Sequence, residues 1–510
     1  MHGMKRLLLM MVLGAFGALG SAPARASVPA IHFESWSDAI FVRARAEHRF
    51  VLLDLGAVWC HWCHVMDQTT YQDPAVVRLV GERFIAVRAD QDADPDLSRR
   101  YEDWGWPATI VFAPDGSEIV KRRGYFEPAV FAQLLQAIID DPSPGPSVLP
   151  QKPWRASDRT HLTAAARSKL ETFFAAKFDQ RWAGWGTIQK YLDGEAIEYA
   201  LTDSRYRAMG RRTLDAALAL IDPVWGGMYQ DSDGVDWKSP HYEKIMQVQT
   251  EAIDLYAQYA GLHEPQYLAA ARAIGRYLNN FLTSPEGAFY TSQDADVDEK
   301  ITGKIYYAQD DAGRRKLGMP RIDTHVYPRE NGWVIGSFAR LYAATHEADW
   351  LDRARRAAEW IDAHRLNEDG SYRHGDADRA GPYLGDTLAM AEAQLALAGV
   401  DPSGPWLRRA IRSATAIERR FGDPAGGFRT APVSGKAEGV FAAPAKIVEE
   451  NVAMARLAQR LFAATGDARW RALRSQAMRY LTSPTLVEVR PFSPGVLMVD
   501  AAPEPKAAAR

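Results

Sequence analysis

The stretch VLLDLGAVWCHWCHVMDQ, residues 51–68, decides the fold of the first part of this chain. Its apolar and β-branched opening, residues 51–57, predicts a buried strand, and the residues after Cys60 predict a helix. The two cysteines, Cys60 and Cys63, are three positions apart and therefore lie at the start of that helix. A helix N-terminus carries partial positive charge, which favours the thiolate form of Cys60. We expect Cys60 to attack in disulfide exchange and Cys63, one turn further along, to resolve the mixed disulfide.

The flanking segments extend this strand and helix into an alternating pattern from Trp36 to Asp141. Short β-branched runs alternate with helical stretches, as in a sheet flanked by helices. Asp73 and Pro74 are typical of a helix start, with Asp as the N-cap and Pro at the first position. The predicted strands are VLLDLGA (51–57), FIAVRAD (84–90), ATIVFAP (108–114) and EIVKRRG (118–124), and a closing helix is predicted from Pro128 to Ile139.

Two further residues stand where thioredoxins carry functional residues. Asp54, six residues before Cys60, resembles the buried thioredoxin carboxylate that can take the proton from the resolving cysteine. Pro107 resembles their cis-proline, which faces the cysteines and would hold a partner peptide. The order of strand, CxxC helix, strand, proline, hairpin and helix predicts an α/β thioredoxin-like fold for residues 30–141.

The residues around the two cysteines add to this prediction. His61, between them, is predicted to stabilise the thiolate and make the pair more oxidising. Trp59, Trp62 and Trp106 are predicted to contact the client. The reversible disulfide would then be the redox group, and we expect neither a separate cofactor nor a metal.

Two other uses of the cysteines stay open at this point. Residues 60–64 also fit C-x-x-C-H, the attachment signature of c-type haem. Cys60 and Cys63 with His61 and His64 are in addition soft ligands for copper or zinc, although their spacing is too tight for all four to surround one ion. A haem or copper binding or maturation factor is therefore an alternative.

The first 26 residues predict export. Lys5 and Arg6 provide a positive start, residues 7–19 an apolar stretch, and residues 24–26 a small-x-small cleavage site. We expect cleavage near Ala26 and a periplasmic or secreted protein without stable membrane insertion; an uncleaved anchor is the alternative. The net charge of -3 over 510 residues gives no electrostatic footprint for nucleic acid.

A second, helical part follows the proline-rich segment 142–155, which we expect to be a stiff extended linker. From 156 to 485 the apolar residues recur at helical spacing. Helices followed by short turns recur along this part, as do glycines that precede an aromatic residue. Eleven candidate helices with alternating long and short connections favour a closed ring of helical hairpins, with an open superhelix as the alternative. Residues 486–510 are expected to be a C-terminal tail.

Longer stretches of both parts resemble one family. CHWCHVMDQTTYQDPAVVRLVGERFIAVRADQDADPDL followed by WGWPATIVFAPDG is similar to the thioredoxin-like domain of the YyaL-like, spermatogenesis-associated family. The resemblance continues through SPHYEKIMQVQTEAIDLY, TSPEGAFYTSQDADVDEKITGKIYY and EENVAMARLAQRLFAATGD. It implies that residues 156–485 form an all-α (α/α)6 toroid of the six-hairpin glycosidase-like type, like those of glycoside-processing enzymes and sugar epimerases.

Polar residues at the expected inner-ring helix starts form a candidate substrate site in the toroid. Paired carboxylates there would suit general acid–base chemistry on a carbohydrate, and the alternative is that they cap helices. The candidates are Glu195, His241, Glu243, Asn331, Asp386, Glu450 and Asn451, with the loop residues Asp294 and Asp296.

The main hypothesis is thus an exported thiol-disulfide oxidoreductase that exchanges disulfides with a protein client. In this hypothesis the toroid recognises the client or a glycan. The alternatives are a carbohydrate-active or carbohydrate-binding toroid with an accessory thioredoxin domain, and the haem or copper factor.

Overall fold

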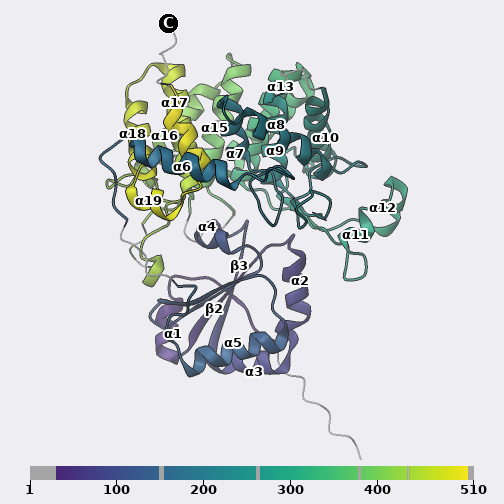
Figure 1. Cartoon of the computed structure of the whole chain (residues 1–510), viewed down its shortest axis with the longest axis vertical. Coiled ribbons are helices and arrows are strands. Elements are labelled where there is room, and N and C mark those ends of the chain that lie inside the picture. The colour runs from purple at the N-terminus through teal and green to yellow at the C-terminus, as the bar shows by residue number, and fades with distance from the viewer. Residues whose placement is uncertain are drawn as a thin grey trace, which may run out of the picture.

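The computed structural model describes residues 30–148, 154–259, 265–376, 381–433, 435 and 437–503. Within them the chain forms a small mixed sheet covered by helices and a larger ring of helices (Figure 1). The predicted targeting peptide, residues 1–26, and residues 149–153 of the predicted linker lie outside the described residues. No helix among the described residues is both long enough and apolar enough to cross a membrane.

The first part is built around strand β2 (Phe50–Gly56), the middle strand of a five-stranded sheet in the order β1-β3-β2-β4-β5. All four strands predicted from the sequence are present, and the thioredoxin-like fold is confirmed. β2 pairs in parallel with β3 (Phe84–Asp90) and antiparallel with β4 (Ala108–Phe112), while β1 (Glu34–Ser35) and β5 (Glu118–Arg123) are the edges.

Alternate residues of β2 contribute to two apolar cores, one on each face of the sheet. Leu53 packs with helices on one face, and Leu52 packs with helices on the other. Because every residue of β2 is buried, the carboxylate of Asp54 is buried as well. The first face is covered by α1 (Ile40–Glu47) and α4 (Pro95–Tyr101), and the second by α2 (His61–Gln68), α3 (Pro74–Arg83) and α5 (Pro128–Asp140).

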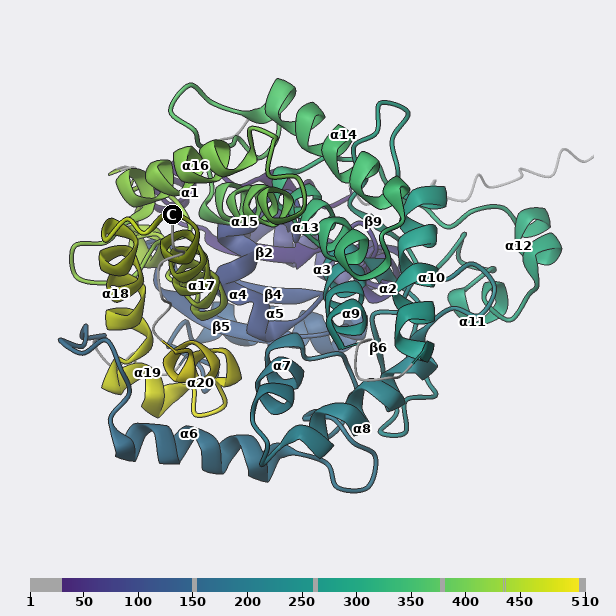
Figure 2. The same ribbon diagram turned by 90° about the horizontal axis from the view of Figure 1, so that it is seen from above.

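The second part is a closed double ring of helices, seen from above in Figure 2. Six described helices form the inner ring, and each packs against an outer partner. The inner helices are α7 (Gly194–Thr202), α9 (Met246–Tyr259), α13 (Pro328–Thr345), α15 (Leu384–Val400), α17 (Val448–Thr465) and α20 (Pro494–Ala501). The outer helices are α8 (Arg207–Ala217), α10 (Pro265–Phe281), α14 (Ala348–Arg365), α16 (Trp406–Phe421), α18 (Arg469–Leu481) and α6 (Ala164–Lys177). The (α/α)6 toroid is therefore confirmed.

The ring is closed by residues that we predicted to be a tail. Helix α20 packs between α7 and α17 and against α6, so the first and last helices of the ring meet. Asp500 in α20 accepts a hydrogen bond from the backbone N–H of Leu162 (2.9 Å). The predicted boundary at 485 is thus wrong. Helix α20 is short and, apart from Asp500, carries only apolar residues and glycine, so the sequence shows no helical periodicity there.

The recurring glycine-aromatic segments are turns that end outer helices. In four of these turns, a residue that follows the glycine pairs as an antiparallel bridge with a residue just beyond the end of the preceding helix. The bridges are Met228 with Ile221, Phe289 with Thr283, Tyr372 with Leu366 and Phe428 with Gly422. A polar side chain of the next inner helix then bonds the peptide at that position. The pairs are Gln249 with Met228, Asn331 with Phe289, Thr387 with Tyr372 and Asn451 with Phe428.

Asn331 and Asn451, which we predicted in a substrate site, therefore have a structural role. The side-chain amide of Asn331 accepts from the N–H of Phe289 (2.8 Å) and donates to its carbonyl (3.0 Å). Asn451 repeats both bonds with Phe428. Both side chains are fully buried, so neither is open to a ligand.

The sheet domain lies across one mouth of the ring, with α4 directed towards it (Figure 1). The guanidinium of Arg100 in α4 donates to the carbonyls of Val440 and Ala443, and the hydroxyl of Thr430 donates to Asp96 (2.6 Å). Phe441 of the ring domain enters the core of the sheet domain. The two domains are thus joined by apolar and polar contacts.

Candidate redox site between the two domains

The two cysteines are joined as a disulfide at the start of α2. Cys60 is the N-cap residue, and its Sγ accepts a hydrogen bond from the backbone N–H of Cys63 (3.1 Å). This position follows directly from the sequence, since a buried strand leads into a helix that begins after Cys60. Cys60 is only 4% exposed, because residues of both domains surround it.

A buried carboxylate is present in the strand that leads to the cysteines, as the resemblance to thioredoxins implied. Asp54 in β2 accepts hydrogen bonds from the hydroxyl of Tyr71 (3.0 Å) and the Nε of Arg88 (2.8 Å). Burial raises the pKa of Asp54, and the nearby charge of Arg88 offsets only part of this effect. A carboxyl with a raised pKa is suited to exchange a proton with a cysteine.

Of the three tryptophans predicted to contact a client, two are used inside the protein. Trp59 donates from Nε1 to Asp92 (3.0 Å), and Trp106 donates to Gln91 (3.1 Å). Trp62 is 46% exposed and is therefore available to a partner. The peptide bond between Trp106 and Pro107 is cis, which agrees with the cis-proline implied by the sequence.

A cleft of about 710 Å³ lies beside the disulfide, between the two domains. Because both domains line it, a molecule that reaches Cys60 through this cleft would touch both. The sheet domain contributes Trp59, Cys60, His61, Trp62, Trp106 and Arg123, and the ring domain contributes Tyr191, Asp231, His241, Tyr242, Glu243, Asp296 and Lys304.

Three carboxylates that we predicted in the toroid's substrate site instead face the CxxC helix. Asp296 is paired with Nδ1 of His61, and Asp294 lies 3.5 Å from Nδ1 of His64. The carboxylate of Glu243 lies near the backbone N–H of His61 and lines the same cleft as His61. The ring domain therefore supplies the acidic surroundings of the redox helix.

These contacts change the protonation of the groups involved. The hydrogen bond to Asp296 raises the pKa of His61, whereas burial lowers the pKa of His64. Burial raises the pKa of Asp294 to about 8. The pKa of His241, in the ring wall of the cleft, is raised to about 9 by its hydrogen bond to Asp231.

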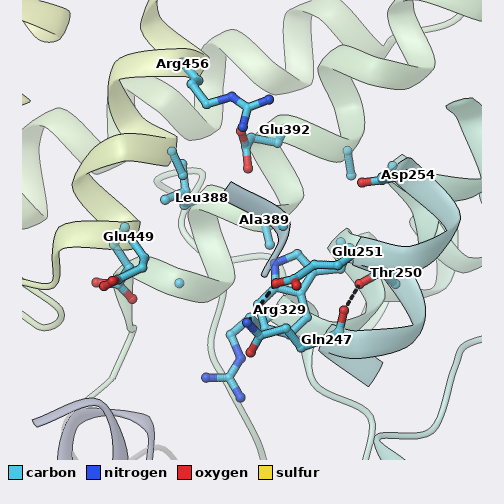
Figure 3. A pocket seen from close by; sticks show the side chains of 18 of the residues that line it. Gln247, Thr250, Glu251, Asp254, Arg329, Leu388, Ala389, Glu392, Glu449 and Arg456 are labelled. Atoms are coloured by element: carbon cyan, nitrogen blue, oxygen red, sulfur yellow. Dashed lines mark hydrogen bonds between the residues drawn. The ribbon is translucent and has the colours of Figure 1, made fainter. Parts of the chain in front are cut away.

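A second cavity, of about 290 Å³, lies at the centre of the ring. Figure 3 shows Arg456 and Glu392 at one end of it and Arg329 nearer the other. It also contains the predicted residues Glu195 and Glu450; burial raises their pKa values to about 8 and about 7. The cavity is thus lined by a mixture of carboxylates and guanidinium groups.

The arginines and several acids of this cavity were absent from our prediction. Gln247, Glu251 and Asp254 line it from one face of α9, and Glu449 and Arg456 from one face of α17. A polar stripe at helical spacing on an otherwise buried helix was the signal that could have identified them.

Asp386, which we also predicted in the toroid's substrate site, lies outside the central cavity. It is paired with Nδ1 of His374 (3.0 Å), and it accepts from the backbone N–H of Arg329 (3.1 Å). It therefore caps the start of α13 and does not line the central cavity. This outcome corresponds to the alternative that such residues cap helices.

The fold and the site together define a class: a thioredoxin-like domain with a CxxC disulfide, docked on a six-hairpin helical toroid. Residues 24–140 match the family described as "Thioredox_DsbH: Protein of unknown function, DUF255". The chain is homologous to the spermatogenesis-associated protein 20 family, which confirms the resemblance found in the sequence. It is 26% identical to spermatogenesis-associated protein 20 of Mus musculus over 302 residues, 51% of this chain and 38% of that protein.

The chain spans about two fifths of the length of two curated relatives, 41% and 38%. Over 110 residues, 21% of this chain and 19% of the other protein, it is 34% identical to thiol:disulfide interchange protein DsbD 2 of Pseudomonas aeruginosa. Among solved structures, cellobiose 2-epimerase from Bacillus thermoamylovorans matches with a TM-score of 0.48 and 12% identity, over 61% of this chain and 85% of that chain. A D-mannose isomerase matches with a TM-score of 0.49 and 13% identity, over 62% of this chain and 84% of that chain.

The alternative of a metal or haem site would use the two cysteines. Among the described residues, no group of three or more His, Cys, Asp and Glu side chains is arranged to hold a metal ion. Both cysteine sulfurs are bonded to each other, so each would have to be released before it could bind copper or haem.

Proposed function

We propose that this protein is an exported thiol-disulfide oxidoreductase in which Cys60 and Cys63 exchange a disulfide with a protein client. The observation that supports this most directly is the position of Cys60. Its sulfur caps an eight-residue helix, accepts the N–H of Cys63 and lies at the edge of a cleft. The chain is also 34% identical over 110 residues to a thiol:disulfide interchange protein.

In the reducing direction, the thiolate of Cys60 attacks one sulfur of the client disulfide. The client S–S bond breaks, its electron pair leaves with the second client sulfur, and a mixed disulfide on Cys60 forms. Cys63 then loses its proton to Asp54 and attacks the sulfur of Cys60. The mixed S–S bond breaks, the client sulfur leaves with the electron pair and takes the proton from Asp54, and the client is released as a dithiol. The reverse sequence oxidises a client dithiol.

The cleft favours a client segment that presents its sulfur between the two domains. Trp62 offers an exposed aromatic surface at the cleft, and Lys304 and Asp231 offer both signs of charge on the ring side. We propose that the toroid recognises the client in this way. The apolar stretch and cleavage site within residues 1–26 favour a periplasmic or secreted location, where protein disulfides form.

The experiment is a comparison of Cys60→Ser with Cys63→Ser in insulin reduction and in mixed-disulfide trapping. Wild-type protein should reduce insulin disulfides, and both variants should be inactive. Cys63→Ser should accumulate a covalent complex that dithiothreitol dissolves, because its attacking sulfur is intact. Cys60→Ser should form none. Failure of the wild-type protein to exchange disulfides with insulin or with trapped clients would overturn the proposal.

The central cavity supports a second candidate function, the binding of a glycan in the toroid. Oε2 of Glu450 and Nη1 of Arg329 are buried, line the cavity, and have no hydrogen-bond partner among the described residues. Unpaired buried polar atoms are costly and suit a hydroxyl-rich ligand. A glycan array should show binding that Glu450→Gln abolishes and that Glu418→Gln, on outer helix α16, leaves unchanged. No bound glycan would count against this function.

A further inference from the structure

Glu243 belongs to the ring domain, yet its carboxylate lies at the start of the CxxC helix. Its carboxylate lies near the backbone N–H of His61, the residue directly after Cys60, and it lines the same cleft as Cys60. Ile245, two residues further along, packs against Trp59 and Cys60. The carboxylate and the attacking sulfur therefore share one end of helix α2.

The residues on both sides of Glu243 fix this position. The ammonium group of Lys244 is fully buried and donates to Asp222 (2.7 Å). His241, on the other side, is paired with Asp231 (2.8 Å). Because its neighbours are anchored in the ring domain, Glu243 is held against the redox helix by the fold of the second domain.

One oxygen of the Glu243 carboxylate is unpaired. Oε2 is buried and has no hydrogen-bond partner among the described residues, and Glu243 as a whole is only 6% exposed. Burial raises the pKa of this carboxyl above its usual range. A buried carboxyl with a free oxygen takes up a proton more readily than an exposed one.

Other charged groups surround the same end of the helix. His61 is paired with Asp296, and His64 lies near Asp294. Asp231 and His241 face Glu243 from the ring, and Lys304 lies in the cleft. Two of these groups, Asp296 and Asp231, already have histidine partners, whereas the free oxygen of Glu243 does not.

We propose that Glu243 is the proton acceptor and donor for Cys60, so that the second domain completes the redox centre. This inference rests on the proposed thiol-disulfide exchange. It gives the ring domain a chemical part in the reaction that is separate from recognition of a client or a glycan.

In the first step the S–H bond of Cys60 breaks, and its proton passes to Oε2 of Glu243, directly or through one water. The thiolate then forms a bond to one client sulfur, and the client S–S bond breaks. The electron pair leaves with the second client sulfur, which takes the proton from Glu243. The proton and electrons therefore balance without any further reactant.

The test is Glu243→Gln in the Cys63→Ser background, where Cys60 is the single thiol. The rate of alkylation by iodoacetamide, followed against pH, reports the pKa of Cys60. Removing the carboxylate should lower this pKa by about one unit, because a like charge no longer opposes the thiolate. In protein with both cysteines, the rate of insulin reduction per Cys60 thiolate should fall by about tenfold or more.

Glu299→Gln is the matched control, since Glu299 is an exposed residue of the ring domain and the substitution is the same. Glu243→Asp keeps the carboxylate but moves it away from Cys60 by one methylene. It should therefore also lower the pKa of Cys60, by less than Glu243→Gln does. This second variant also gives a result if Glu243→Gln does not fold.

The outcomes separate this inference from the proposed function. Equal Cys60 titrations in Glu243→Gln and Glu299→Gln, in proteins that still reduce insulin, would overturn the role of Glu243 and leave the oxidoreductase standing. Absence of exchange in the wild-type protein would overturn both.

Discussion

Nδ1 of His61, in the CxxC helix of the sheet domain, is paired with the carboxylate of Asp296, 235 positions further along the chain in the ring domain. The contact therefore crosses the cleft, from His61 directly after Cys60 to Asp296 in the ring-domain wall. The electrostatic surroundings of the redox cysteine are therefore set by how the two domains dock. The following predictions test these surroundings and the fold that produces them.

Asp296→Asn should lower the pKa of His61. The hydrogen bond to Asp296 is the largest cause of the raised value, and the amide removes both the charge and the acceptor strength of the carboxylate. The His61 imidazole signal, followed by NMR against pH, measures the change. Asp298→Asn, at an exposed position in the same loop, should leave the titration as in wild type. An unchanged His61 titration in Asp296→Asn would contradict the pairing.

Asp54→Asn should slow the release of the mixed disulfide on Cys60. The buried carboxyl could no longer take the proton of Cys63, so the second attack should become slower by about 10²-fold. Rapid mixing of the reduced protein with a chromogenic disulfide separates the first and second attacks. Asp67→Asn is a suitable control, because Asp67 shares Arg88 with Asp54 but is far more exposed. Equal rates of the second attack in both variants would argue against a proton transfer at Asp54.

Asp222→Asn should destabilise the ring domain by about 3–5 kcal/mol. Asp222 accepts from both Lys244 and Arg314, and all three side chains are fully buried. The substitution therefore leaves two buried cations without their counter-charge. Chemical denaturation followed by circular dichroism measures the change. Asp311→Asn, at a surface ion pair with Arg315, should cost less than about 1 kcal/mol; similar losses for the two variants would show that the buried cations do not depend on Asp222.

The pairing of His241 with Asp231 should make stability fall with rising pH. The pKa of His241 is raised from 6.5 to about 9 in the folded protein, so protonated His241 stabilises the fold fully below pH 6.5. This contribution is lost as the pH rises through about 9. Because the side chain is one-third exposed, the effect should be modest. The melting temperature of wild type minus that of His241→Gln should decline over this pH range, and a constant difference would refute the linkage.

Ending the chain after Arg490 should destroy the cooperative unfolding of the ring domain. The deletion removes α20, the sixth inner helix, and exposes the apolar faces of α7 and α17 that pack against it. Thermal unfolding by circular dichroism checks this. A chain ending after Pro503 keeps α20 and should unfold like the full chain. A cooperative transition in the shorter chain would mean that α20 is dispensable.

The redox motif and its fold could be predicted from the sequence because they depend on short-range effects. The strand of 51–57, the N-cap at Cys60 and the Asp73–Pro74 helix start all result from interactions within a few residues. A buried carboxylate at Asp54 was predictable for the same reason, since the strand around it is continuously apolar.

The candidate residues of the toroid were harder to predict, because one local pattern serves several purposes. Asn331 and Asn451 stand at helix starts like Glu450, yet their amides bond a neighbouring peptide, whereas Glu450 lines the central cavity. Helix α20 could not be predicted, because its eight residues are mostly apolar and do not alternate between an apolar and a polar face as in an amphipathic helix.

The sequence by itself determined the cysteine pair, the strand and helix that position it, and the helical hairpins of the second domain. Only the tertiary structure decided that the ring closes through α20 and that Glu243, Asp294 and Asp296 face the CxxC helix. The reason is physical. Local structure depends on hydrogen bonds and burial within a short segment, while the partners of a surface carboxylate depend on how separately folded domains dock.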